Sequence, residues 1–159
     1  MAVTIDDIRA AADRLERKVV RTPTLRSDAL SALCGANIVL KLENLQLTGS
    51  FKPRGVFIKL SGLSEKEVKA GVVAASAGNH AQGVAYHARQ LGIPATIYMP
   101  EGTPFTKVGR TEGLGATVVL AGAGLAEARA VAFSQCEEQG QVKVSAIRHP
   151  GNGLGCQRF

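Results

Sequence analysis

The chain has 159 residues, of which 45% are hydrophobic and 20% are charged, and its formal net charge is +6. This composition is typical of a globular protein and excludes a disordered or collagen-like chain. Basic residues are scattered among acidic ones and aromatic residues are few, which argues against nucleic-acid binding and favours solvated surface charge. Half of the net charge lies in residues 143–159, which hold three basic residues and no acidic one.

Membrane insertion and secretion are not expected from the sequence. No stretch approaches the roughly 20 apolar residues that a membrane-spanning helix requires. Residues 1–9 contain two acidic residues and no apolar core, unlike a secretory signal peptide. Cys34, Cys136 and Cys156 show neither a Cys-x-x-Cys spacing nor a paired histidine, so we predict reduced thiols without a disulfide or a metal site. Together these features predict a cytoplasmic protein.

Three features predict the N-terminal elements. Residues 4–7 resemble a helix capping box, and the apolar residues that follow share one helical face as far as Val19. Residues 37–42 are short and include β-branched side chains, which indicates a strand. Pro53 suits the first position of a further helix.

From residue 64 onward, helices alternate with short strands. Residues 64–67 form a full capping box, and Gly71 ends the helix that it opens. Helices with apolar stripes are predicted from Ala81 to Leu91, after residues 103–104, and from Leu125 to Cys136. Strands are predicted over residues 72–75, 95–99, 117–121 and 142–147.

This alternation predicts an α/β fold, with an open twisted parallel sheet that carries helices on both faces. Ligands of such sheets bind beyond the carboxyl ends of the strands, in the turns that follow. Those turns are therefore the candidate binding sites.

The turn after residues 72–75 has the sequence Ser76-Ala77-Gly78-Asn79-His80 and leads into a helix. Free backbone N–H groups and the positive end of the helix make such a turn a site for an anion. Gly78 and Gly83 would let a ligand approach the backbone. The alternative is an ordinary strand–helix turn with an asparagine cap.

A second candidate site surrounds Lys52. Pro53 at a helix start puts Lys52 near the N-cap, where the positive helix end lowers the pKa of an amine, as a Schiff-base lysine requires. Gly49 and Gly55 leave room around the lysine, and Phe51 offers an aromatic face. The alternative is a solvated lysine at a helix end.

Lys41–Gln46, Gly49–Gly55 and Ser76–Gly83 together resemble threonine ammonia-lyase (threonine dehydratase), of the pyridoxal-phosphate enzymes related to the tryptophan synthase β-chain. The resemblance extends over about residues 4–142. It implies a pyridoxal 5'-phosphate cofactor and the β-elimination of threonine or serine to a 2-oxo acid and ammonia. It also implies a small-molecule amino-acid substrate, homo-oligomeric relatives and a place in isoleucine biosynthesis.

The resemblance also implies roles for individual residues. Lys52 would form the Schiff base with the cofactor and remove the substrate Cα proton, while Phe51 packs beside the cofactor ring. Asn79 would hydrogen-bond the phenolic oxygen of the cofactor. The substrate carboxylate would be held by Ser76, Ala77, Gly78, Asn79 and His80. Nothing in the sequence suggests a nicotinamide cofactor, because residues 122–127 lack the third glycine of a dinucleotide fingerprint.

Two alternatives to an ammonia-lyase stay open. Related serine racemases carry a serine where this chain has Ala77, and alanine has no exchangeable proton, so elimination without racemisation is favoured. A non-catalytic remnant or interaction module is the other alternative. We expect His80 to be structural and His87 to be a partly buried helix residue without a catalytic role.

The resemblance implies two domains. Residues 1–62 would begin a large cofactor domain that includes the Schiff-base lysine, residues 64–147 would form the small α/β domain, and residues 148–159 diverge. The match fades after about residue 142, which we interpret as a truncated or frameshifted coding sequence. The glycine-rich run 151–155 comes too early to be the phosphate loop. We therefore expect the chain alone to bind the cofactor poorly and to be inactive.

Overall fold

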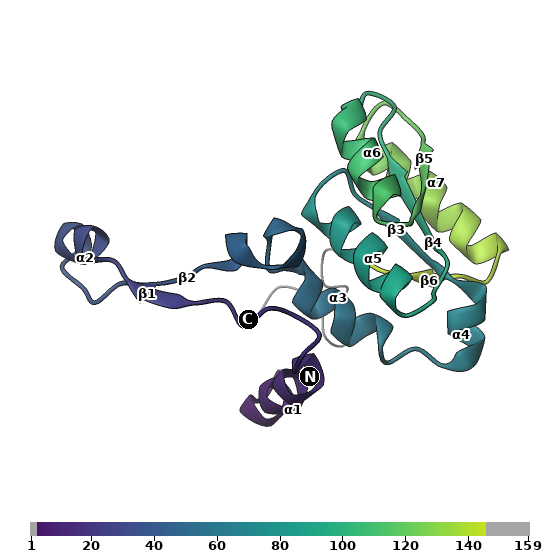
Figure 1. Cartoon of the computed structure of the whole chain (residues 1–159). Coiled ribbons are helices and arrows are strands. Elements are labelled where there is room, and N and C mark those ends of the chain that lie inside the picture. The colour runs from purple at the N-terminus through teal and green to yellow at the C-terminus, as the bar shows by residue number, and fades with distance from the viewer. Residues whose placement is uncertain (1–2, 146–159) are drawn as a thin grey trace.

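A parallel four-stranded sheet lies at the centre of the larger body of the molecule (Figure 1). The computed structural model describes residues 3–145, and within them this sheet has the strand order β5-β4-β3-β6. Its strands are β3 (Val72–Ala75), β4 (Ala95–Met99), β5 (Thr117–Leu120) and β6 (Val142–Lys143). The predicted α/β class is confirmed. β6 is shorter than predicted, and residues 146–147 of the predicted strand lie outside the described residues.

Helices cover both faces of this sheet, as predicted (Figure 1). Successive residues of a strand point to opposite faces. Accordingly Val72 and Ala74 of β3 join the core cluster that holds α5, while Val73 packs with Ala132 and Cys136 of α7. The helices that flank the sheet are α5 (Asn79–Gln90), α6 (Phe105–Gly113) and α7 (Leu125–Glu138).

Helix α3 (Lys52–Leu60) joins this body to the N-terminal segment. Val56 and Leu60 on one face of α3 are buried in the core cluster of α5 and the sheet. Phe57 and Ile58, on another face, pack with Leu15 of helix α1 (Ile5–Leu15). Because α3 contributes to both cores, it links the two parts that the sequence assigns to separate domains, whose boundaries stay a prediction.

Both predicted capping boxes are present. In α1, the Asp7 amide donates to Thr4 Oγ1 at 3.2 Å. In α4 (Glu65–Ala70), the Ser64 amide donates to the Glu67 carboxylate at 2.8 Å. Gly71 ends α4 as predicted.

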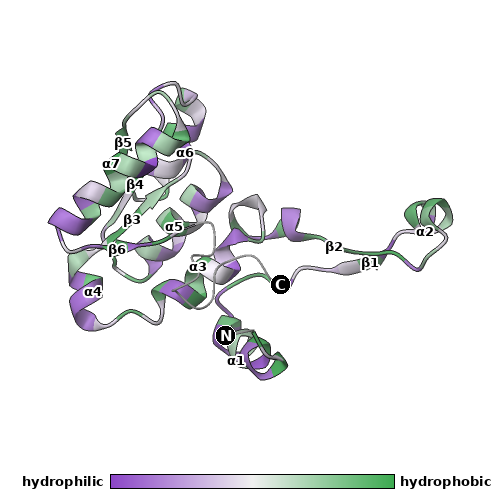
Figure 2. Cartoon of the chain, turned by 180° about the vertical axis from the view of Figure 1, so that it is seen from behind, coloured by the Kyte–Doolittle hydropathy of each residue, from purple (hydrophilic) through white to green (hydrophobic). Residues whose placement is uncertain are grey.

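An arm that the sequence predicted only in part extends away from the body (Figure 1). Strand β1 (Thr24–Arg26) pairs antiparallel with β2 (Val39–Lys41), and helix α2 (Asp28–Cys34) lies at the far end. β2 falls within the predicted strand 37–42, whereas β1 and α2 were not predicted. Apolar side chains of the arm are exposed, Leu33 the most at 82%, and Figure 2 shows α2 as hydrophobic.

Three predictions about helices are wrong in detail. α1 ends at Leu15 and does not reach Val19, because the backbone leaves the helical conformation at Glu16, with ψ at 128°, and Arg17 then adopts a positive φ of 60°. Leu91 and Leu125, assigned to the apolar stripes, are exposed because each lies at the end of its helix.

Within residues 3–145, no helix is both long and apolar enough to cross a bilayer. In the same part of the chain, no cluster of three or more His, Cys, Asp or Glu side chains is arranged to hold a metal ion. Cys34 is exposed and Cys136 is buried, and both are free thiols. Cys156 lies outside the described residues.

Candidate active site

Gly83 brings the two candidate sites of the sequence together. A Cβ added at Gly83 would lie 3.4 Å from the Pro53 nitrogen and 3.5 Å from the Lys52 carbonyl carbon. These are ordinary contact distances for a single methyl group, so the first turn of α3 lies directly on α5 and leaves no room for a side chain larger than alanine. The expectation that Gly83 admits a ligand is wrong, because the backbone of α3 fills that space.

Lys52 is the first residue of α3 and follows Phe51, which occupies the N-cap position. The helix thus begins one residue before Pro53, where the sequence placed its start. Lys52 Nζ lies 5.0 Å from the centroid of the Phe51 ring, and 40% of Phe51 is exposed. The amine and an accessible aromatic face are therefore neighbours, as the sequence led us to expect.

The turn after β3 presents backbone N–H groups at the start of α5. The Ser76 amide donates to the Tyr98 carbonyl at 3.0 Å, and the Gly78 amide donates to Ser76 Oγ at 3.3 Å, so the turn is held in place. Gly78 is the N-cap and Asn79 the first helical residue, so an asparagine cap is not what the structure shows.

Three further properties of this turn favour an anion. The first N–H groups of a helix have no intrahelical carbonyl to bind. Among the described residues, nothing lies within 4 Å of a Cβ built on Gly78, so the space beside it is open. The first turn of α5 contains no acidic residue.

Two further predicted site residues lie in this turn. Ala77 packs against the hydrophobic core cluster of α5 and the sheet, and Asn79 is exposed.

His80 links this turn to Val144, the residue that follows β6. Its side chain is buried, and its Nε2 lies 2.9 Å from the Val144 carbonyl oxygen. Burial lowers the pKa of His80, and the positive charge of Lys52 lowers it further. His80 thus joins the start of α5 to the residue that follows β6, while the closeness of Lys52 to α5 rests on the packing at Gly83.

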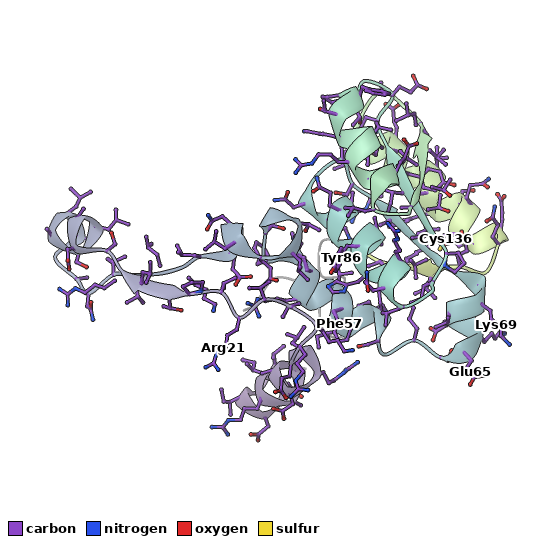
Figure 3. All side chains as sticks on the ribbon, in the orientation of Figure 1. Arg21, Phe57, Glu65, Lys69, Tyr86 and Cys136 are labelled. Carbon is purple, nitrogen blue, oxygen red and sulfur yellow. The ribbon has the colours of Figure 1, made fainter. Side chains whose placement is uncertain are left out.

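His87 lies two helical turns after His80 and is fully buried, not partly buried as predicted. The centroid of the His87 ring is 5.3 Å from that of Phe57 and 5.0 Å from that of Tyr86. Figure 3 labels Phe57 and Tyr86, which lie together where α3 contacts α5. Within the described part of the chain, its Nε2 has no hydrogen-bond partner. Burial lowers the pKa of His87 to about 4.

A cavity of about 570 Å³ lies elsewhere, between α1, the segment after it and the start of α3. Its lining includes Leu15, Val20, Lys41 and Phe51, but neither Lys52 nor the turn 76–80. This cavity is therefore not the predicted site, with which it shares Phe51 alone among the predicted residues.

Residues 15–158 match the family described as pyridoxal-phosphate dependent enzyme. L-threonine ammonia-lyase of Thermotoga maritima is 49% identical over 93% of this chain and 37% of its own length. L-threo-3-hydroxyaspartate ammonia-lyase of Pseudomonas sp. is 46% identical over 91% of this chain and 45% of its own. L-threonine dehydratase catabolic TdcB of Escherichia coli is 43% identical over 94% of this chain and 46% of its own length.

Among solved structures, maize serine racemase superposes with a TM-score of 0.83 at 36% identity, over 96% of this chain and 45% of its own. The chain thus spans less than half the length of these relatives. The family match extends to residue 158 and so includes nearly all of residues 148–159, whose separation from the small domain stays a prediction.

Proposed function

Because the chain belongs to the family of pyridoxal-phosphate-dependent enzymes, we propose that it serves the deamination of threonine or serine by β-elimination, which yields a 2-oxo acid and ammonia. The chain spans less than half the length of its curated relatives. In this proposal the chain supplies the reactive lysine and the carboxylate-binding turn, and we expect it alone to release no 2-oxo acid from threonine.

One observation carries this proposal: the backbone of Lys52, at the start of α3, lies against α5 at Gly83. Gly83 is four residues after Asn79, the first residue of α5, so the start of α5 lies about one helical turn from this contact. An amine beside an open anion-binding turn is the arrangement that an amino-acid substrate requires, because its carboxylate and its Cα must be held together.

The residues present fit pyridoxal phosphate. Lys52 offers an amine, Phe51 an accessible ring face, and Asn79 an exposed amide that can donate to a phenolic oxygen. When bound, the cofactor supplies the electron sink for the bond that breaks at the substrate Cα. Lys52 would hold the cofactor and then carry the Cα proton.

The turn orients the substrate for that proton transfer. The N–H groups at the start of α5 would bind the carboxylate, and the hydrogen bond from Gly78 to Ser76 fixes their direction before any ligand arrives. The bond of His80 to Val144 anchors the same turn from below. A site built in advance in this way costs little reorganisation when the substrate binds.

Ala77 favours elimination over racemisation. A racemase needs a second proton carrier on the other face of the Cα, and the methyl group of Ala77 carries no exchangeable proton. Exchange of enantiomers by this site is therefore not expected, although the fold resembles a serine racemase. If the site catalysed racemisation, chiral chromatography would detect D-serine after incubation of L-serine with the chain.

The proposal is tested by incubating the chain with pyridoxal phosphate, reducing with borohydride and mapping the modified lysine by peptide mass spectrometry. We expect modification of Lys52, its loss in Lys52→Ala and its retention in Lys59→Ala, a matched change on the same helix. Absence of modification at Lys52 would favour a non-catalytic remnant. Detection of 2-oxobutanoate from threonine above the Lys52→Ala background would overturn the inactivity of the chain alone.

Finer properties belong to the same proposal. We propose a cytoplasmic enzyme of amino-acid metabolism whose full-length relatives are homo-oligomers. Two metabolic roles are compatible with this activity, isoleucine biosynthesis and threonine breakdown, since one relative is named as a catabolic dehydratase.

A further inference from the structure

Five polar residues form a cluster on the side of α3 that faces away from the lysine. Residues two positions apart in a helix point about 200° apart, so Arg54 leaves α3 roughly opposite to Lys52. We call this cluster the polar clamp; its members are Thr22, Lys41, Glu43, Gln46 and Arg54.

The centre of the polar clamp is a two-pronged ion pair. Arg54 Nε donates to Glu43 Oε2 and Arg54 Nη2 donates to Glu43 Oε1, both at 2.8 Å. Only 17% of each side chain is exposed. Thr22 Oγ1 donates to the same carboxylate at 2.5 Å. The Arg54 hydrogen bonds, together with that from Thr22, hold the pKa of Glu43 below its usual value, so the carboxylate is ionised at neutral pH.

The remaining members hold the segment 20–22 against this ion pair. Gln46 Nε2 donates to the Val20 carbonyl and the Val20 amide donates to Gln46 Oε1, both at 2.8 Å. Lys41 Nζ donates to the Thr22 carbonyl at 2.5 Å. Arg54 Nη2 also donates to the Val20 carbonyl at 3.2 Å, so residues 20–22 are fixed by the side chains of three residues, Lys41, Gln46 and Arg54.

The charges show why α3 needs such a clamp. Its first turn carries two cations, Lys52 and Arg54, and no acidic residue. Cations at the start of a helix face the positive end of its dipole, which destabilises that end. Within the described residues, no side chain caps the start of α3. Glu43 supplies the missing negative charge from outside the helix and forms an ion pair with Arg54.

We propose that Glu43 and Arg54 are positioning residues, which hold the first turn of α3 against α5 and thereby aim Lys52 at the turn 76–80. The opposite side of that first turn rests on Gly83, so the lysine backbone is held from two sides. This inference rests on the proposed function for what Lys52 does, and on the ion pair and the contact with Gly83 for where Lys52 lies. It also gives a structural role to Glu43, Gln46 and Arg54, the polar residues near Lys52 that are assigned to neither the cofactor nor the substrate.

The test uses Glu43→Gln, Arg54→Gln and the double variant in the full chain. Asp28→Asn is the control, because it removes an exposed ion pair with Arg26. The first measurement is amide hydrogen exchange in peptides covering residues 51–56. We expect exchange about tenfold faster in each single variant, no further increase in the double variant, and no change over residues 79–90 or in Asp28→Asn.

The second measurement is borohydride-trapped modification by pyridoxal phosphate, as the ratio of Lys52 to the exposed Lys107 in the same sample. We expect this ratio to fall about tenfold in each single variant and no further in the double variant, since both residues act through one ion pair. If wild-type Lys52 shows no preference over Lys107, the proposed function fails, while hydrogen exchange still decides the positioning role. Unchanged exchange over residues 51–56, or a rise that equally affects residues 79–90, would overturn the inference.

Discussion

His87 makes the stability of the fold depend on pH. Its folded-state pKa is about 4, whereas the pKa of an unperturbed histidine is 6.5. As the pH falls below 6.5, the unfolded chain binds a proton that the folded chain does not bind until the pH approaches 4. The free energy of unfolding should therefore fall by about 2 kcal/mol between pH 7 and pH 5 through His87 alone.

His87→Leu isolates this contribution. Leucine cannot titrate and suits the apolar surroundings of Phe57, while other titrating groups such as His80 stay the same in both proteins. Urea denaturation at pH 7 and pH 5 gives the free energy of unfolding of each. We expect the wild type to lose about 2 kcal/mol more than His87→Leu on acidification. Equal losses would show that His87 is protonated in the folded state and would refute its burial between α3 and α5.

Three further changes test the packing and the caps. Gly83→Val should lower the free energy of unfolding, measured by urea denaturation, by about 1–3 kcal/mol, because the methyl groups of valine would meet the backbone of α3. Gly83→Ala should be tolerated, and equal stability of the two variants would contradict the close contact. Ser64→Ala should cost about 1 kcal/mol by loss of the capping box, and an unchanged Tm would contradict this. Maleimide should label Cys34 in the folded chain and Cys136 only in urea, since Cys136 is buried and its thiol pKa is raised; rapid labelling of Cys136 in the folded chain, seen by peptide mass spectrometry, would speak against that burial.

Elements specified by local sequence were predictable. The strand 95–99 is a short apolar run with a clear end on each side, and the capping box 64–67 is complete within four residues. β1 and α2 escaped prediction because β1 has only three residues, all exposed, and its partner strand lies more than ten residues away. Such a strand has no apolar periodicity to detect.

The candidate site was predictable only in part, for a similar reason. The resemblance singled out Lys52 and the turn 76–80, but no pattern in the chain says that they meet. Their meeting depends on the crossing of α3 and α5 at Gly83, which is a property of two packed helices. The pairing of Glu43 with Arg54 depends likewise on how the segment before α3 folds back.

The most direct test of the central claim is an NMR titration of the chain with pyridoxal phosphate, followed through the amide signals of Lys52 and residues 76–80. If they form one site, both sets of signals shift together with a single apparent Kd, and the turn signals no longer shift in Lys52→Ala at the same concentrations. Shifts with different Kd values, or shifts of Lys52 without the turn, would contradict the account.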